Sequence, residues 1–464
     1  MKLRTAQTAG LLILLSAMTF AQQVASSAAP APTPAPAPQG GVQAVPKADT
    51  PAFSPLDGVN GALPQWIRFS GQIRFRAEGY TNGGFNSANE DGYLLTQLFL
   101  NLKLQPTRWM KFYFQSMDSH APWKNKLPAN APFRDTMDLR LGYVEFGDME
   151  KPSVSFRFGR QELDFGEGRV LGLSPWANTP RSFDGFRTSY VGNGYRVDGF
   201  AATVVPINQN EFDWSKPGNN LYGVYSSFKK LVPKATFEPY LLWRRQAGLK
   251  SELGITGIAN YGTYGLRWVG KLPANFDYNI EIDGQHGSLG AENISAWASH
   301  WMVGYSFPKV RFAPRFFTEY NYASGDKNAT DNTKGTFDQL YPSGHDKYGL
   351  TDQFGWENIS YIRTGPEFKF TKRWTGTVRY NSYWLADVHD GIYNSIGAVL
   401  VPRRAAGNAG KYVGQGFDLI TSYKVNTRLI VGGGYGKLFA GTFLKNTTPG
   451  ASYNYPYFMT TYSF

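Results

Sequence analysis

One stretch of the sequence, residues 158–190, brings together the side chains best suited to bind an anion. A guanidinium group is planar and can hold both oxygens of a carboxylate at once. The same stretch contains leucines and aromatic residues that a loop in open water would not need. We therefore interpret residues 165–182 as a loop that packs against other parts of the protein and presents arginines to an anionic ligand. The arginines of this stretch are Arg160, Arg169, Arg181 and Arg187.

Catalytic chemistry finds little support in the sequence. The 5 histidines are scattered, no two of them lie at a metal-ligand spacing, and no nucleophile motif such as G-x-S-x-G stands out. Asp326 to Asp331 brings oxygen ligands together but lacks the spacing and the closing Glu of an EF-hand, so an ordinary surface loop is preferred to a calcium site. We predict a protein that is not an enzyme and that has no cofactor and no metal site.

The N-terminus predicts export from the cytoplasm. Residues 1–21 combine Lys2 and Arg4 with an apolar run from Ala9 to Phe20, too short to span a bilayer as a helix, and a small residue at Ala21. This is the arrangement of a secretory signal peptide. With Cys 0, the exported chain has no disulfides and depends on burial or on a membrane for its stability. A net charge of +12 favours an anionic partner, and export excludes nucleic acid.

Residues 22–63 are expected to form a disordered periplasmic lead-in. Ala and Pro dominate Ala28–Val45, and this composition favours polyproline II and cannot bury a core. An arm that binds peptidoglycan or a protein partner is the alternative function for this segment.

From Trp66 onward, apolar and polar residues alternate with the period of two that indicates β-strands. About eighteen such runs follow one another, an even number, as in bacterial outer-membrane barrels. The links alternate in length, as in the short link 192–194 and the long link 322–359, which is expected when turns are periplasmic and loops extracellular. Both ends of a soluble β-protein lie in water, so that alternative has no reason to show this pattern. We predict an all-β fold in which residues 64–464 form a transmembrane antiparallel β-barrel in the outer membrane.

The chain ends on an aromatic residue, Phe464, with Tyr462 and Phe458 at alternate positions before it. This ending resembles the signal that the barrel-assembly machinery recognises in outer-membrane proteins. We therefore expect that machinery and outer-membrane lipid among the partners of this protein.

The alternation places charged residues inside the barrel, because Arg or Lys on the lipid face costs roughly 2–4 kcal/mol at the membrane centre. Inward bases outnumber inward acids, so we expect some arginines to face solvent or a ligand in an aqueous channel, with wall ion pairs as the alternative for each. Arg160 shares the lipid-facing side of Phe156 and Phe158 unless the strand ends or bulges there, and we expect it above the membrane rim. The other arginines of interest are Arg74, Arg76, Arg140, Arg157, Arg311 and Arg363.

Two segments resemble a known family. The first reads F-R-F-G-R-Q-E-L-D-F-G-E-G-R-V-L-G from Phe156 and continues W-A-N-T-P-R-S-F-D-G-F-R to Arg187, and the second is Ser324–Ile359. Both are similar to recurrent segments of the alginate export family of outer-membrane porins. This resemblance implies an eighteen-stranded barrel with an arginine-lined, electropositive pore that passes anionic polyuronate. Its recurrent arginines correspond to Arg160, Arg169, Arg181 and Arg187.

These observations favour an anion-selective outer-membrane channel that passes a polyuronate or a related acidic saccharide by diffusion. A structural or adhesive barrel that binds polysaccharide without transport, and a general porin for small solutes, are the alternatives. The expected partners are an anionic polysaccharide or oligosaccharide and periplasmic export or uptake components. Two arrangements are open for the loops: either residues 165–182 fold inward and narrow the pore, or they fold outward and residues 322–357 act as the lid.

Overall fold

The computed structural model describes residues 53–126 and 133–464. The predicted signal peptide and the lead-in up to residue 52 lie outside the described residues. The last part of the predicted disordered lead-in contains a short helix, α2 (Asp57–Ala62), so the prediction was wrong there. The side chain of Asn60 exchanges two 2.8 Å hydrogen bonds with the backbone N–H and C=O of Phe69, which attaches this segment to the first strand.

Eighteen strands close an antiparallel barrel in the described part of the chain, which confirms the predicted fold class. Three short strands lie in the links between barrel strands: β14 (Thr333–Lys334) pairs in parallel with β12, and β17 (Ile392–Tyr393) pairs with β18 (Val399–Val401). Two further short helices are η2 (Gly83–Phe85) and α3 (Thr442–Thr447). The barrel strands are β1 (Ile67–Tyr80), β2 (Asp91–Thr107), β3 (Met110–His120), β4 (Asp135–Phe146), β5 (Ser153–Gln161), β6 (Phe183–Gly192), β7 (Tyr195–Val204), β8 (Asn219–Phe228), β9 (Ala235–Lys250), β10 (Thr256–Lys271), β11 (Phe276–Leu289), β12 (Glu292–Ser306), β13 (Arg315–Ala323), β15 (Ile359–Lys369), β16 (Trp374–Leu385), β19 (Tyr412–Lys424), β20 (Leu429–Ala440) and β21 (Tyr453–Ser463).

The first and last strands close the barrel. β1 pairs with β2 on one side and with β21 on the other. The C-terminal residue extends this seam, because Phe464 accepts a 2.6 Å hydrogen bond from the N–H of Gly71 and donates one of 2.9 Å back to its carbonyl. A Cβ atom at position 71 would lie 2.5 Å from the Phe464 ring, so glycine is required where the terminal aromatic residue packs.

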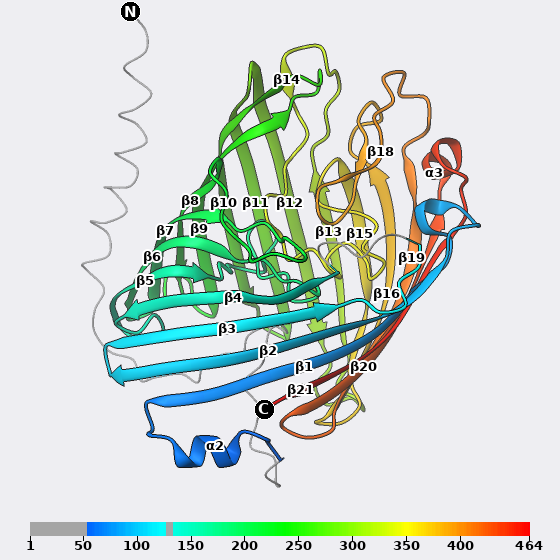
Figure 1. Cartoon of the computed structure of the whole chain (residues 1–464). Coiled ribbons are helices and arrows are strands. Elements are labelled where there is room, and N and C mark those ends of the chain that lie inside the picture. Colours follow the sequence, from blue (N-terminus) through cyan, green and yellow to red (C-terminus); the bar gives the residue numbers. More distant parts are fainter. Residues whose placement is uncertain (1–52, 127–132) are drawn as a thin grey trace, which may run out of the picture. The chain divides into compact units, whose positions relative to one another are not determined.

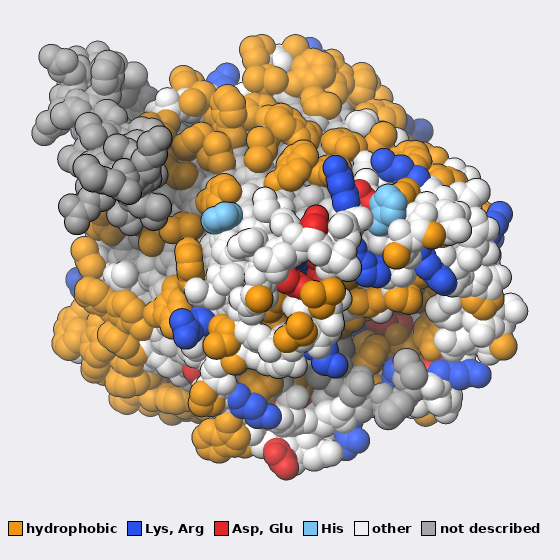
Figure 2. Space-filling view, turned by 90° about the horizontal axis from the view of Figure 1, so that it is seen from above, with side chains coloured by type: hydrophobic (Ala, Val, Ile, Leu, Met, Phe, Trp, Pro, Cys, Tyr) orange, Lys and Arg blue, Asp and Glu red, His pale blue; other side chains and the backbone are white. Residues whose placement is uncertain are grey.

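The two faces of the wall differ as the alternation predicts. On β11, Asn279, Glu281 and Asp283 are buried inside, whereas Ile282 is 42% exposed on the outside. Figure 2, which looks onto one end of the barrel, shows hydrophobic side chains along much of the left and top edges and charged side chains of both signs on the face toward the viewer. No helix among the residues that the structure describes is long and apolar enough to cross a membrane.

The two ends of the barrel carry different links. Helix α2 and the end of β21 lie at one end, at the bottom of Figure 1, and β14, β18 and α3 lie at the other. Because consecutive strands are antiparallel, the short links share the end that carries α2. The long links that matter for function, after β5, β7 and β13, share the opposite end, which is the extracellular end of such a barrel.

Candidate functional site

Two long links fold into the barrel and meet there. We call residues 162–182, between β5 and β6, the first plug segment, and residues 336–357, between β14 and β15, the second plug segment. A parallel β-bridge joins them at Leu171 and Tyr341. The Gly172 N–H donates to the Tyr341 carbonyl (3.0 Å), and the Tyr341 N–H donates to the Val170 carbonyl (2.9 Å). The two segments therefore form one unit, which we call the plug.

Two arginines of β1 hold the first plug segment. Arg74 donates to the carbonyls of Pro175 (2.7 Å) and Ala177 (3.0 Å), and Arg76 donates to the carbonyl of Trp176 (2.7 Å). The Arg76 guanidinium also lies 3.8 Å from the centroid of the Trp176 ring, a close cation–π contact. These guanidiniums satisfy backbone carbonyls that would otherwise be buried without a donor.

The indole of Trp176 links the two plug segments as well. The ring of His345 stacks on it, with centroids 3.7 Å apart and planes 4° apart. Since Arg76 and His345 both approach the centroid this closely, the indole lies between them.

Arg140 of β4 anchors the same segment at both of its ends. It forms an ion pair with Glu162 and donates to the carbonyl of Pro180 at 3.3 Å. The wall residue Gln115 accepts a further hydrogen bond from Arg140.

Arg169 crosses to the opposite wall. Its guanidinium donates to Asn321 of β13 (3.2 Å), contacts His300 of β12 (3.1 Å) and pairs with Glu167 of its own segment (3.3 Å). Only 2% of Arg169 is exposed. A segment that reaches β1 at Trp176 and β13 at Arg169 must lie across the barrel interior.

Arg181 packs between the two segments. It donates to the carbonyls of Gly172 and Pro342, both at 3.4 Å, and its guanidinium lies 5.4 Å from the Tyr341 ring. Burial lowers the pKa of Arg181 to about 10. The inward fold predicted for residues 165–182 is confirmed, but Arg169 and Arg181 are enclosed by protein groups.

Residues 322–357 were expected to form a lid only if the first loop folded outward. This expectation was wrong, because both segments fold into the barrel. The second plug segment fills the interior beside the first, with Phe337, Tyr348, Leu350 and Trp356 each at most 1% exposed. The sequence predicts an aqueous lumen at this level, whereas the structure packs it with side chains. Strand pattern alone cannot show this, because apolar loop residues leave no periodic signal.

Carboxylates of the second plug segment bind wall arginines. Asp338 accepts hydrogen bonds from Arg244 of β9 (2.5 Å) and from the Tyr261 hydroxyl (2.7 Å). Burial alone would raise the pKa of Asp338, but the charges of Arg244 and Lys334 and the hydrogen bonds that the carboxylate accepts together outweigh burial and hold the pKa below its usual value. Asp346 forms an ion pair with Arg379 of β16, and its pKa is lowered in the same way.

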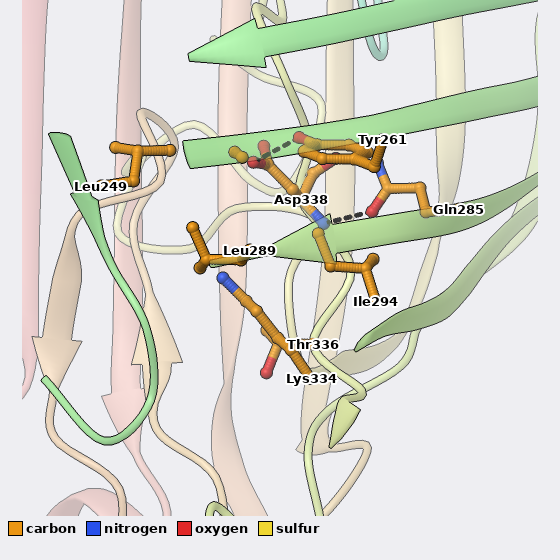
Figure 3. A pocket seen from close by; sticks show the side chains of 9 residues that line it. Leu249, Tyr261, Gln285, Leu289, Ile294, Lys334, Thr336 and Asp338 are labelled. Carbon is orange, nitrogen blue, oxygen red and sulfur yellow. Dashed lines mark hydrogen bonds between the residues drawn. The ribbon is translucent and has the colours of Figure 1, made fainter. Parts of the chain in front are cut away.

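Figure 3 shows the surroundings of Asp338. Its carboxylate faces Tyr261, and its N–H donates to the Gln285 side chain at 2.9 Å. A cavity of about 20 Å³ remains beside these groups, room for about one water molecule. The second plug segment therefore fits closely against β10 and β11.

The remaining predicted arginines of the strands pair mainly with carboxylates of the wall itself. Arg157 pairs with Glu145 (2.6 Å), Arg187 with Asp198 (2.9 Å), Arg160 with Asp184 (2.8 Å) and Arg363 with Glu319 (3.0 Å). The wall-pair alternative therefore holds for these residues. The count of charges suggested that some arginines face the lumen without a partner, but these four do not.

Arg160 is buried, although it has the strand parity of the exposed Phe156 and Phe158, and the backbone is irregular at Gly159 just before it. Gly159 has φ +114°, and a Cβ there would lie 2.4 Å from the carbonyl oxygen of Gly142, so only glycine permits the irregularity. The guanidinium then reaches the carbonyls of Leu139 (3.0 Å) and Asp213 (2.8 Å) within the barrel. The pairing of β5 with β4 and with β6 continues through Gly159 and Arg160 without a register shift, so the structure shows no bulge there, and the expected place of Arg160 above the membrane rim stays a prediction.

Arg311 is not an inward residue, so this prediction was wrong. The expected strand 310–321 begins only at Arg315. Phe312 and Ala313 have positive φ angles, and Pro314 follows them, so the chain turns here and cannot yet pair as a strand. Arg311 is exposed in this short turn, and its guanidinium lies over the Phe312 ring at 4.6 Å.

Three wall arginines outside the predicted site prove to contact the plug. Arg244 and Arg379 bind Asp338 and Asp346, and Arg267 of β10 lies 3.7 Å from Glu167. The alternation marks all three as inward, but nothing in the sequence shows that their partners come from loops.

Comparison with solved structures supports the architecture. The Acinetobacter baumannii protein OccAB2 has a TM-score of 0.59 at 10% identity, over 86% of this chain and 98% of that one. OpdK, an outer-membrane protein of Pseudomonas aeruginosa, has 0.58 at 10% identity, over 86% and 99%. OccD3 (OpdP) of the same organism has 0.57 at 13% identity, over 86% and 91%. At these identities the likeness establishes the fold alone.

Sequence comparison establishes the family. No curated protein matches the chain. The model of the alginate export family matches residues 65–458, which include both plug segments and all but the last few residues of the barrel. The protein is an outer-membrane β-barrel that belongs to the alginate export family.

Proposed function

We propose that this outer-membrane channel is selective for anions, that it passes an acidic saccharide of the polyuronate class, and that the plug described above is its closed arrangement. One observation carries the proposal: inward arginines on four different strands are paired with carboxylates that the plug supplies. These pairs are Arg140 with Glu162, Arg267 with Glu167, Arg244 with Asp338, and Arg379 with Asp346.

The pairs with the plug differ from the pairs within the wall. In a wall pair such as Arg315 with Asp277, both partners are on strands and stay together when a loop moves. In a pair such as Arg244 with Asp338, one partner is on a segment that can leave. A uronate carries the same carboxylate group as Asp or Glu, and can therefore replace the plug at these guanidiniums.

Exchange of carboxylates keeps the energy of opening low. An arginine that loses its only partner inside a protein is left with an uncompensated charge, which is strongly unfavourable. When a ligand carboxylate takes the place of Asp338 or Asp346, Arg244 or Arg379 keeps a charged partner throughout. Water that enters the opened lumen then weakens each contact, so the ligand can move on to the next arginine.

Planar-bilayer recording tests the proposal. The reversal potential in a salt gradient should indicate anion preference, and uronic-acid oligomers should permeate or block the pore at lower concentrations than neutral oligosaccharides of equal length. The double variant Asp338→Asn/Asp346→Asn should raise the conductance. Asp277→Asn is the matched control, because it removes the same group from Arg315, which keeps Glu367 at 2.9 Å.

Two outcomes would contradict the proposal. Equal permeation of acidic and neutral oligomers would indicate a general porin. The packed interior also favours the second candidate, an adhesive barrel that binds polysaccharide without transport. If the wild type and the variant Asp338→Asn/Asp346→Asn both fold correctly and neither conducts, that candidate is supported.

A further inference from the structure

Three buried carboxylates that take no part in the plug pairs converge at the extracellular end of the barrel. Asp135 and Asp138 belong to β4, and Asp213 belongs to the link between β7 and β8. Their exposed fractions are 0%, 2% and 2%. One carboxylate oxygen from each lies within 4.8 Å of the others.

The backbone of β4 is distorted so that both of its aspartates face inward. Positions 135 and 138 would point to opposite faces of a regular strand. Met137, between them, has φ 48°, and the register between β3 and β4 shifts between Met117 and Ser119. Met137 is consequently 74% exposed, and the two aspartates share the inner face.

Few donors serve these carboxylates. Asp138 accepts a hydrogen bond from the Asp213 N–H at 3.2 Å, and the Asp213 carboxylate accepts one from the Asn208 N–H at 2.6 Å. The nearest cation is Arg160, whose guanidinium lies 3.8 Å from Asp138. Its Nε atom is engaged by Asp184 at 2.8 Å, so it compensates the cluster only in part.

Asp135 has no cationic partner among the residues that the structure describes. Neither of its carboxylate oxygens accepts a hydrogen bond from the described part of the chain, although the side chain is fully buried. The adjacent N–H, that of Thr136, donates instead to the Gln209 carbonyl at 3.3 Å. A buried carboxylate without a donor or a counter-charge is unfavourable, and such a group in a native protein calls for a ligand.

We propose that Asp135, Asp138 and Asp213 bind one divalent cation, with Ca²⁺ as the preferred ion. Carboxylate oxygens are hard ligands that suit Ca²⁺ or Mg²⁺, and the cluster has no nitrogen or sulfur ligand that would favour zinc. Oxygens around one Ca²⁺ lie roughly 2.3–2.6 Å from it, and hence at most about 5 Å apart. The observed convergence within 4.8 Å satisfies this condition. Bidentate binding and a flexible shell favour Ca²⁺ over the stricter octahedron of Mg²⁺.

The cation would join β4 to the link that carries Asp213. These two parts already touch through the Thr136 and Gln209 hydrogen bonds, and Arg160 donates to the Asp213 carbonyl at 2.8 Å. The site was not visible in the sequence, because Asp213 lies 75 residues from Asp138 along the chain.

Calorimetric titration of the purified, chelator-treated full-length chain with CaCl₂, and separately with MgCl₂, tests the site. We expect saturable binding of one Ca²⁺ per chain, weaker binding of Mg²⁺, and at least a tenfold loss of Ca²⁺ affinity in Asp135→Asn and in Asp213→Asn. Asp331→Asn is the control, because it removes a carboxylate from an exposed extracellular link and should leave the affinity unchanged. Heat-dependent mobility in gel electrophoresis reports whether each variant has formed its barrel.

Several results would overturn the proposal. Absence of saturable binding by the folded wild type at millimolar Ca²⁺ and Mg²⁺ would do so without any variant. Unchanged affinity in folded Asp135→Asn and Asp213→Asn, or an equal loss in Asp331→Asn, would show that the cation binds elsewhere.

Discussion

Leu171 and Tyr341 form a parallel β-bridge inside the barrel, although they belong to links that follow different strands. A third hydrogen bond, from the Ser343 N–H to the Gly168 carbonyl at 2.7 Å, extends the pairing. Because both segments also bind wall arginines, neither can leave the interior without breaking contacts to the other. Opening therefore concerns the whole plug.

Arg74 and Arg76 are expected to keep the plug in place. The sequence predicts that both point inward, and in the structure both are buried and donate to plug carbonyls. Hydrogen bonds from charged donors contribute about 1.5–3 kcal/mol each. Arg74→Gln/Arg76→Gln should therefore raise the open probability in bilayer recordings at least tenfold, which corresponds to about 1.4 kcal/mol.

The same variant should make the plug accessible to trypsin at Arg169 and Arg181. Arg196→Gln is the control, because Arg196 pairs with Glu150 and Asp198, which both lie outside the plug. Equal protease resistance of the double variant and the control would exclude an anchoring role for the β1 arginines.

Trp176 should be a second anchor, since its ring lies between Arg76 and His345. Trp176→Ala removes a cation–π contact and a stacked ring, each with a contribution of about 0.5–2 kcal/mol. We expect brief openings to become more frequent, with an unchanged barrel. Trp214→Ala, at an exposed position in another extracellular link, should behave as the wild type. Similar opening rates in both variants would argue against the anchor.

The plug should stay closed across the neutral range and loosen only in acid. Asp338 and Asp346 have lowered pKa values in the docked plug, because nearby cationic side chains and hydrogen bonds together outweigh the effect of burial. A carboxylate whose pKa is lowered contributes stability above its ordinary value, about 4, and loses it as the pH falls through the lowered value. Conductance should therefore be flat from about pH 7 to 5 and rise below about pH 4. A rise that is complete by pH 5 would show that other groups control opening.

Glu357 should act in the opposite direction. It is 7% exposed, and burial, followed by the charge of Asp338, raises its pKa well above the usual value. The packed site therefore favours the protonated carboxyl, and its contribution is lost as the pH rises through the raised value. Glu357→Gln should raise the unfolding temperature more at pH 8 than at pH 5. An equal change at both values would show that the charge of Glu357 is not what destabilises the plug.

The wall of this protein can be predicted from its sequence alone. Alternation on a strand decides which side chains meet lipid, and a charge there is so unfavourable that inward residues such as Arg74 and Arg363 can be assigned from their parity. Link lengths then fix which end of the barrel carries the loops. Phase errors arose only where the backbone departs from the strand, as at Arg311, beside the positive φ of Phe312 and Ala313.

What fills the barrel, and which charges are paired, depends on long-range packing that the strand pattern does not show. Arg244 and Asp338 lie 94 residues apart, and the plug brings them together, whereas Arg157 pairs with Glu145 on the neighbouring strand. Local sequence carries no signal that separates these two kinds of arginine, because both sit at inward strand positions. The difference comes from the packing of two irregular links against each other, and that packing depends on contacts among residues distant in the chain.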